Sequence, residues 1–223
     1  MADSADADRR PLYIAIEGVI GVGKTTLARL LGPMFDAAVQ LEVFEENPFL
    51  KDFYSDRARF AFQVQIFFLL SRYQQQRRLD GSRNVISDYM FAKDWLFAHL
   101  NLAGDEMGLY ESVYAALIEK VRVPDLVVYL WADVDTLMAR IAYRDRSYER
   151  DMDRDYIAAL VGAYDGFFGA YTDARVLRLD TRDLNYVANA EALAQVAGQV
   201  RAALNLGTYQ PPLLNGIAPA APR

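Results

Sequence analysis

The sequence predicts an α/β fold in which one five-stranded parallel sheet carries helices on both faces. Short apolar segments alternate with longer segments of helical periodicity along the 223 residues, a pattern typical of such sheets. No internal repeat or linker divides the chain, and its length suits a single domain with a sizeable core.

The expected elements follow in chain order. Short, mostly apolar segments predict strands at 12–17, 38–44, 84–88, 126–131 and 175–179. Longer periodic segments predict helices at 23–35, 49–79, 89–102, 109–121, 134–143, 155–171 and 186–204. Ligands of such sheets bind beyond the carboxyl ends of the strands, so the residues that follow each strand are the ones to consider.

The first strand leads into a complete phosphate-binding loop. The residues expected to contact a triphosphate are Gly18, Val19, Ile20, Gly21, Val22, Gly23, Lys24, Thr25 and Thr26. The glycines let successive N–H groups turn toward phosphates at the positive end of the following helix. Lys24 can reach the outer phosphates, and the Thr25 hydroxyl can bind Mg²⁺. The segment predicts binding of a nucleoside triphosphate.

Carboxylates follow the next two strands. Glu42 comes from the second strand and Asp88 ends the third. One carboxylate there can accept a proton from an attacking hydroxyl, and another can hold Mg²⁺ through water. Carboxylates at strand ends are equally often solvated caps, and we expect Glu45 and Glu46 to be of that kind.

The bulk composition fits a small enzyme of the cytoplasm. A net charge of −6 argues against a general nucleic-acid binder, and the sequence contains no cysteine. The longest charge-free apolar stretch, 60–71, is too short for a membrane span. Residues 1–10 lack the apolar segment of a signal peptide, and we expect loosely ordered tails at 1–10 and 207–223 around a domain at 11–206.

Several motifs occur in the order of a known family. They are the phosphate loop, Glu42 followed by the Asn-Pro-Phe-Leu of 47–50, the Phe-Tyr-Ser-Asp of 53–56, the segments 64–66 and 70–72, and the Arg-Asp-Arg-Ser-Tyr-Glu of 144–149. From residue 13 to about 204, the chain resembles the bacterial type of deoxyribonucleoside kinase (the deoxycytidine, deoxyguanosine and deoxyadenosine kinase group). The resemblance implies a P-loop kinase fold, a homodimer through long helices, and Mg²⁺-dependent transfer of the ATP γ-phosphate to a deoxynucleoside 5′-hydroxyl.

The resemblance also implies roles on the nucleoside side. Glu42 matches the general base that acts on the 5′-hydroxyl. Tyr54 and Glu149 match the pair that holds the sugar 3′-hydroxyl. Gln65 matches the residue that reads the base edge, and Gln63, on another helix face, is a weaker candidate.

On the phosphate side, Arg140, Arg144 and Arg146 match arginines of a lid that spans about 143–154. A salt-bridged surface is the ordinary alternative for so charged a segment. The loop that carries Asp183 and Asn185 matches the one that wraps the donor base, although it could be a plain turn.

One departure from the family pattern concerns the third strand. Relatives commonly carry an arginine directly after its acidic residue, whereas Tyr89 follows Asp88 here. Lys93 could replace that charge, contact an acceptor on the base, or lie on the surface. We expect Asp88 to remain near Mg²⁺, and a preference for purines is our hypothesis for the base.

Two rival functions stay open. A monophosphate kinase of the thymidylate kinase type would need a basic clamp for a second phosphate, yet the acceptor side offers Glu42 and little positive charge. A non-catalytic subunit with a kinase-like fold would not need an intact Lys24, Glu42 and Glu149. A nucleotide-driven switch is less favoured than either. No catalytic or metal-binding role is expected for His99, the single histidine.

Overall fold

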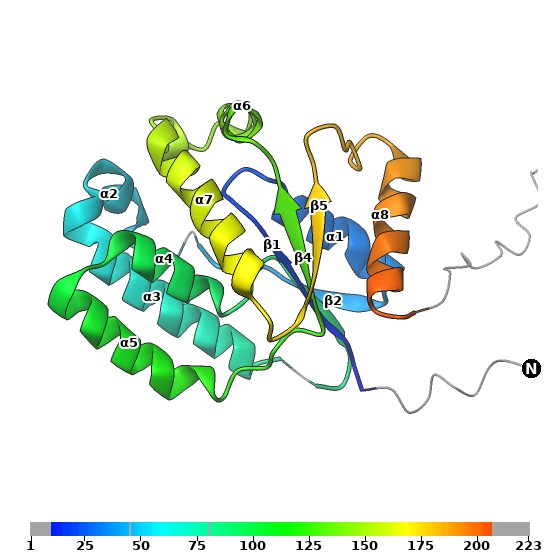
Figure 1. The fold of residues 1–223 in the computed structure, drawn as a ribbon, viewed down its shortest axis with the longest axis horizontal. Helices are drawn as coiled ribbons and strands as arrows, with labels where there is room; N and C mark the ends of the chain where they lie inside the picture. Colours follow the sequence, from blue (N-terminus) through cyan, green and yellow to red (C-terminus); the bar gives the residue numbers. More distant parts are fainter. Residues whose placement is uncertain (1–9, 45, 80, 207–223) are drawn as a thin grey trace, which may run out of the picture.

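The computed structural model describes residues 10–44, 46–79 and 81–206, which form one sheet with helices on both faces (Figure 1). The strands are β1 (Tyr13–Glu17), β2 (Ala37–Gln40), β3 (Asn84–Ser87), β4 (Leu126–Trp131) and β5 (Arg175–Asp180). All neighbouring strands pair in parallel, in the order β2-β3-β1-β4-β5. The predicted five-stranded parallel sheet is confirmed.

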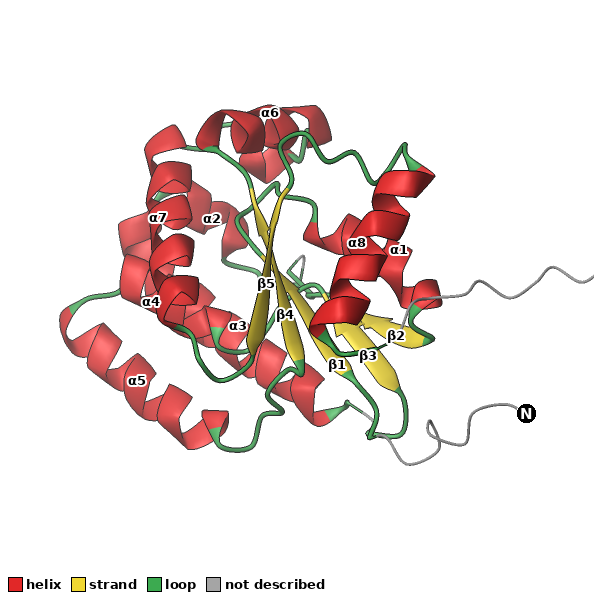
Figure 2. Ribbon diagram, turned by 45° about the vertical axis from the view of Figure 1, so that its right-hand side comes forward, coloured by secondary structure: helices red, strands yellow, loops and turns green. Residues whose placement is uncertain are grey.

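The helices form a layer on each side of the sheet. They are α1 (Lys24–Met34), α2 (Leu50–Ser55), α3 (Arg57–Arg77), α4 (Lys93–Asn101), α5 (Gly104–Ile118), α6 (Val134–Arg144), the short 3₁₀ helix η1 (Ser147–Glu149), α7 (Arg154–Ala170) and α8 (Ala190–Ala203). Figure 2 shows α1 and α8 on one face, and α3, α4, α5 and α7 on the other. The central strand β1 is buried along its whole length because both layers cover it.

The strand order explains where a ligand can bind. The chain leaves β1 toward β2 and β3 on one side and later adds β4 and β5 on the other. The crevice at such a switch point, outside the carboxyl ends of the strands, is where ligands of open α/β sheets bind. The loop between β1 and α1 lies there, together with the segments that follow β2 and β3.

The prediction that the second strand reaches residue 44 is wrong, because β2 ends at Gln40. Beyond it, the Glu42 N–H donates to the Asp88 carboxylate at 2.7 Å and so leaves the ladder. The single helix predicted over 49–79 is also wrong. It is divided at Asp56, which has extended φ (−145°) and caps α3 by accepting from the Arg59 N–H at 3.3 Å.

Other boundaries differ at helix starts. α4 begins at Lys93 rather than 89, because the chain after β3 first turns across the end of β1, where the Met90 N–H donates to Glu17 at 2.7 Å. α5 begins at Gly104, ahead of the predicted 109. α8 begins after Asn189, whose side chain caps it, rather than at 186. Residues 1–9 and 207–223 of the expected tails, and Glu45, lie outside the described residues. Within the described ranges, no helix combines the length and apolarity that a membrane crossing requires.

Candidate active site

The loop between β1 and α1 has the backbone of an anion site. Its glycines Gly18, Gly21 and Gly23 have φ values of +147°, +88° and +106°, a region that side chains disfavour. A Cβ on Gly18 would also lie 2.3 Å from the Leu130 carbonyl oxygen. The sequence therefore needs glycine here, and the loop ends at the N-terminus of the 11-residue helix α1.

Lys24 and Thr25 lie where the sequence predicts them. The Lys24 ammonium donates to the carbonyl oxygens of Gly18 at 2.6 Å and Val19 at 3.3 Å, so it folds back over the loop. Burial, helped by the charge of Lys93, lowers the pKa of Lys24 to about 8. The Thr25 hydroxyl donates to Asp88 Oδ2 at 2.5 Å.

This hydroxyl and carboxylate fit Mg²⁺. Oxygen ligands of these types are the ones that Mg²⁺ prefers, with water and substrate phosphates completing the shell. Among the residues that the structure describes, no group of three or more His, Cys, Asp or Glu could hold a metal ion. The chemistry of Thr25 and Asp88 suits an ion whose other ligands are water and substrate phosphates.

Asp88 also fixes the acceptor side to the loop. Its second carboxylate oxygen, Oδ1, accepts the Glu42 N–H at 2.7 Å, and its own N–H donates to the Gln40 carbonyl oxygen at 3.2 Å. One aspartate thus joins Thr25 of the loop to the backbone of Glu42.

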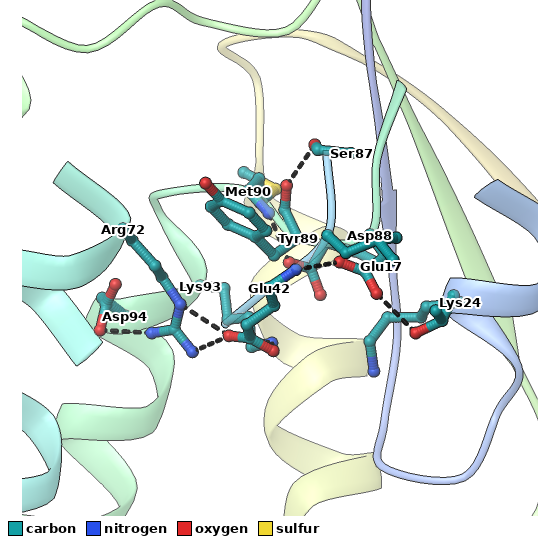
Figure 3. A network of polar contacts seen from close by, with 12 residues as sticks. Glu17, Lys24, Glu42, Arg72, Ser87, Asp88, Tyr89, Met90, Lys93 and Asp94 are labelled. Carbon is teal, nitrogen blue, oxygen red and sulfur yellow. Dashed lines mark hydrogen bonds and ion pairs between the residues drawn. The ribbon is translucent and has the colours of Figure 1, made fainter. Parts of the chain in front are cut away.

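The carboxylate of Glu42 binds two cations (Figure 3). Arg72 Nε donates to Oε1 at 2.8 Å, and Arg72 Nη2 contacts the same oxygen. Lys93 Nζ lies 3.2 Å from Oε1 and 3.0 Å from Oε2. Burial alone would raise the pKa of the Glu42 carboxyl, but Arg72 and Lys93 outweigh it and hold that pKa well below its usual range.

Arg72 and Asp94 are the residues that sequence reasoning missed. Arg72 is 3% exposed, and its Nη1 lies 2.5 Å from Asp94 Oδ1. Asp94 is fully buried, and burial raises its pKa to about 6 against the opposing charge of Arg72. The helical periodicity of α3 could have indicated that Arg72 is buried. Residue 72 shares one helix face with the other buried positions of α3, which are 61, 64, 65, 69 and 76. A charged residue on that face needs a buried partner.

The expected nucleoside residues line the same cavity as Glu42. Tyr54, Gln65 and Glu149 all face it, together with the side chains of Lys93 and Arg72. Gln65 is 2% exposed, and its Oε1 has no hydrogen-bond partner among the described residues. Gln63 is exposed, in agreement with its weaker candidacy.

In the lining of this cavity, Tyr54 stacks on Tyr148 with 6.1 Å between ring centroids. Burial raises the pKa of Tyr54 well above its usual value. Its hydroxyl therefore stays protonated at neutral pH and can donate a hydrogen bond.

Two of the arginines that the sequence predicts for a lid contact the same carboxylate. Arg144 donates to Glu149 Oε2, and Arg146 Nη1 lies 3.7 Å from Glu149 Oε1. The Arg146 guanidinium also lies over the Phe44 ring at 4.2 Å. Both arginines line the cavity, and both form ion pairs with Glu149. Glu149 is the last residue of η1, which directly follows Arg146.

A second hollow borders the phosphate loop. Arg140, Asp183 and Asn185 line it together with residues of the loop. Arg140 donates to Thr181 Oγ1 at 2.9 Å and to the Val22 carbonyl oxygen at 3.3 Å, so it ties the loop to the segment after β5. Asn185 accepts the Ala188 N–H at 3.1 Å as a local cap, and Asp183 is exposed.

Two other residues lie apart from these groups. His99 is on α4 with Nδ1 2.8 Å from the Trp95 carbonyl oxygen and Nε2 3.6 Å from Glu111, outside both hollows just described. Glu46 is exposed, as expected for a solvated residue.

Comparison with known proteins explains the arrangement. A family model described as deoxynucleoside kinase matches residues 14–205. The chain belongs to this family. It is 32% identical over 198 residues to a deoxyguanosine kinase of Bacillus subtilis, covering 85% of this chain and 96% of that one. It is 35% identical over 161 residues to a deoxyadenosine kinase of Dictyostelium discoideum, covering 70% and 66%.

The solved structures agree in fold. A deoxyadenosine kinase from M. mycoides with bound dATP superposes with a TM-score of 0.75 at 24% identity, covering 85% of this chain and 99% of that one. The expected P-loop kinase fold is confirmed. The family and the relatives support a deoxynucleoside kinase, a phosphotransferase, rather than a monophosphate kinase or a non-catalytic subunit.

Proposed function

We propose that this deoxynucleoside kinase transfers the γ-phosphoryl group of ATP to the 5′-hydroxyl of a deoxynucleoside, with Glu42 acting on that hydroxyl. The observation that carries the proposal is the link through Asp88, whose two oxygens bond Thr25 of the phosphate loop and the backbone of Glu42. Donor and acceptor groups are thereby held in one cavity, as in-line transfer requires.

On the donor side, the N–H groups of residues 18–25 and the Lys24 ammonium would bind the phosphates. Thr25, and Asp88 partly through water, would hold Mg²⁺, which neutralises phosphate charge when bound. Lys24 must leave the carbonyl oxygens of Gly18 and Val19 to reach a phosphate.

The lid and the loop after β5 complete the donor side. Arg144 and Arg146 would pass from Glu149 to the transferring phosphoryl group, where their charge is needed. Arg140 would keep the phosphate loop in place, and the segment of Asp183 and Asn185 would border the donor base.

On the acceptor side, Glu42 would orient the 5′-hydroxyl and accept its proton. Because Arg72 and Lys93 hold the pKa of Glu42 well below its usual range, its carboxylate is ionised at neutral pH and is a weak base. This suits phosphoryl transfer, in which positioning and charge matter more than strong proton abstraction. Tyr54 and Glu149 would hold the 3′-hydroxyl. Gln65 Oε1, which has no hydrogen-bond partner within the described ranges, would bind a donor on the base edge.

For Lys93 we favour the charge-replacing role among the three that the sequence leaves open. Its side chain is nearly buried, which argues against surface charge, and Nζ contacts both oxygens of Glu42. Lys93 would therefore hold Glu42 in the place of the arginine that this chain lacks after Asp88.

We propose a preference for purine deoxynucleosides. The support is the similarity to a deoxyguanosine kinase and to a deoxyadenosine kinase. An assay of the four deoxynucleosides, their ribose counterparts and their monophosphates with ATP and Mg²⁺ tests the whole proposal. Efficient use of a purine deoxynucleoside is expected, whereas preferential use of a monophosphate would refute it.

We also propose a cytoplasmic homodimer. Trp95 on α4 is 40% exposed, and it lines a groove together with Ala163, Gly166 and Ala170 of α7. A second copy could cover this aromatic ring and the small residues of α7. Sedimentation analysis should give twice the chain mass of 25.2 kDa, and a monomer at micromolar concentration would refute the dimer.

A further inference from the structure

Glu17 is a buried carboxylate to which the proposed reaction assigns no role. It is the last residue of β1, directly before the phosphate loop, and is 0% exposed. Its carboxylate accepts the Met90 N–H on Oε1 at 2.7 Å, and the Gly18 N–H and the Tyr164 hydroxyl on Oε2, each at 3.1 Å. Burying an ionisable group is costly, so its position invites a functional explanation.

The three partners of Glu17 belong to segments that carry the site. Gly18 opens the phosphate loop, Met90 lies between Asp88 and Lys93, and Tyr164 is on α7. Figure 3 shows Glu17 beside Asp88 and Lys24. Backbone N–H groups can only donate, so both require acceptor oxygens. A carboxylate provides two, whereas an amide of the same shape provides one and turns an NH₂ group toward a donor.

The charge of the carboxylate is a second reason for a glutamate at position 17. Lys93 and Lys24 both act electrostatically on Glu17 and lower its pKa, against the larger effect of burial, which raises it. Lys24 in turn is repelled by Lys93 and attracted by Glu17, Glu42 and Asp88. Glu42 is already bonded to Arg72 and Lys93. The hydrogen bonds of the Glu17 carboxylate among the described residues come from neutral donors, so its charge can offset the repulsion between the two lysines.

We propose that Glu17 is a positioning residue for the phosphoryl transfer described above, a role that rests on that proposed function. Its carboxylate fixes the phosphate loop to the segment that carries Asp88 and Lys93, and it keeps two ammonium groups within one site. Loss of the carboxylate should misplace Lys93, and with it Glu42. The expected nucleoside contacts, Tyr54, Gln65 and Glu149, make no hydrogen bond to Glu17 among the described residues, so nucleoside affinity should change little.

Glu17→Gln tests this role, measured as kcat per nucleoside-binding site, with sites counted by equilibrium titration with the best deoxynucleoside. We expect kcat to fall at least 20-fold while the Kd of the deoxynucleoside stays within threefold. The matched control is Tyr164→Phe, which removes one hydrogen bond to Glu17 but keeps its charge and both backbone contacts; kcat should stay within threefold. A Glu17→Gln enzyme with the wild-type kcat, or an equal loss in Tyr164→Phe, would overturn the proposal.

A double-mutant cycle with Lys93→Met separates positioning from general damage. If Glu17 acts through Lys93, the loss from Glu17→Gln should be at least fivefold smaller in the Lys93→Met enzyme. Independent, multiplicative losses would contradict this. Should Glu17→Gln not fold, Glu17→Asp keeps the charge but shortens the reach; it should lower kcat with unchanged nucleoside affinity, and a wild-type kcat would overturn the proposal.

Different results would refute the kinase activity and the role of Glu17. A wild-type enzyme inactive on all four deoxynucleosides would refute the proposed function and this role with it. An active wild type with an equally active Glu17→Gln variant would refute the role of Glu17 alone.

Discussion

The phosphate loop and the Glu42 cluster, the two halves of the site, are built in opposite ways. The loop is one continuous segment, and its conformation follows from three glycines with positive φ and the start of α1. The Glu42 cluster joins residues from three separate segments, namely Glu42 after β2, Arg72 on α3, and Lys93 with Asp94 on α4. A local segment can be read from sequence, whereas a cluster of distant ion pairs must be seen in the fold.

The largest effect should come from breaking the Glu42 cluster at its centre. Arg72→Met would leave the buried Asp94 and the partly buried Glu42 without their shared cation. Loss of one partner of such a network costs about 3–5 kcal/mol of folding free energy. Denaturant unfolding measures this cost. The control, Arg77→Met, changes an exposed arginine of the same helix and should cost under about 0.5 kcal/mol. Equal stability of the two variants would show that the cluster contributes little.

Substitution of Lys93 should show whether this residue positions Glu42 or contacts the nucleoside base. We expect Lys93→Met to lower kcat about 10–100-fold through misplacement of Glu42, and Lys93→Arg to restore most of the loss. Steady-state kinetics with deoxyguanosine and deoxyadenosine provide the measurement. A change in the preferred base with an unaltered kcat would instead assign Lys93 to base recognition.

In the phosphate loop, the lowered pKa of Lys24 predicts that activity depends on pH. Lys24 has a pKa lowered to about 8 by burial, and only its protonated form binds phosphates strongly. Below pH 8 the charge is present, so kcat/KM for ATP should be constant there and should fall up to tenfold per pH unit above it. A profile that stays flat to pH 9.5 would contradict the environment described for this ammonium group.

The smallest effect should come from the break between α2 and α3. Asp56→Ala removes the cap of α3, which should cost about 1 kcal/mol and lower Tm by roughly 2–4 °C in a domain of this size. Thermal unfolding followed by circular dichroism measures it, with exposed Asp52→Ala as the control. A Tm equal to that of the control would argue against the cap.

Local features of the molecule could be predicted from the sequence, whereas contacts between distant segments could not. The sheet, the loop and Asp88 were accessible from local patterns, and the family resemblance indicated Glu42, Tyr54 and Gln65. The extension of β2 to residue 44 was wrong, because the hydrogen bond from the Glu42 N–H to Asp88 competes with the ladder and joins residues 46 positions apart. Asp94 was missed for a similar reason, since the partner that stabilises its buried charge, Arg72, lies on another helix.

The central claim is that Glu42 acts on the 5′-hydroxyl, and single-turnover kinetics with saturating ATP and deoxynucleoside test it most directly. Glu42→Gln should slow the phosphoryl-transfer step about 10²–10⁴-fold, while Glu46→Gln, a change at an exposed glutamate nearby, should leave it unchanged. A Glu42→Gln enzyme that transfers the phosphoryl group at the wild-type rate would contradict the account.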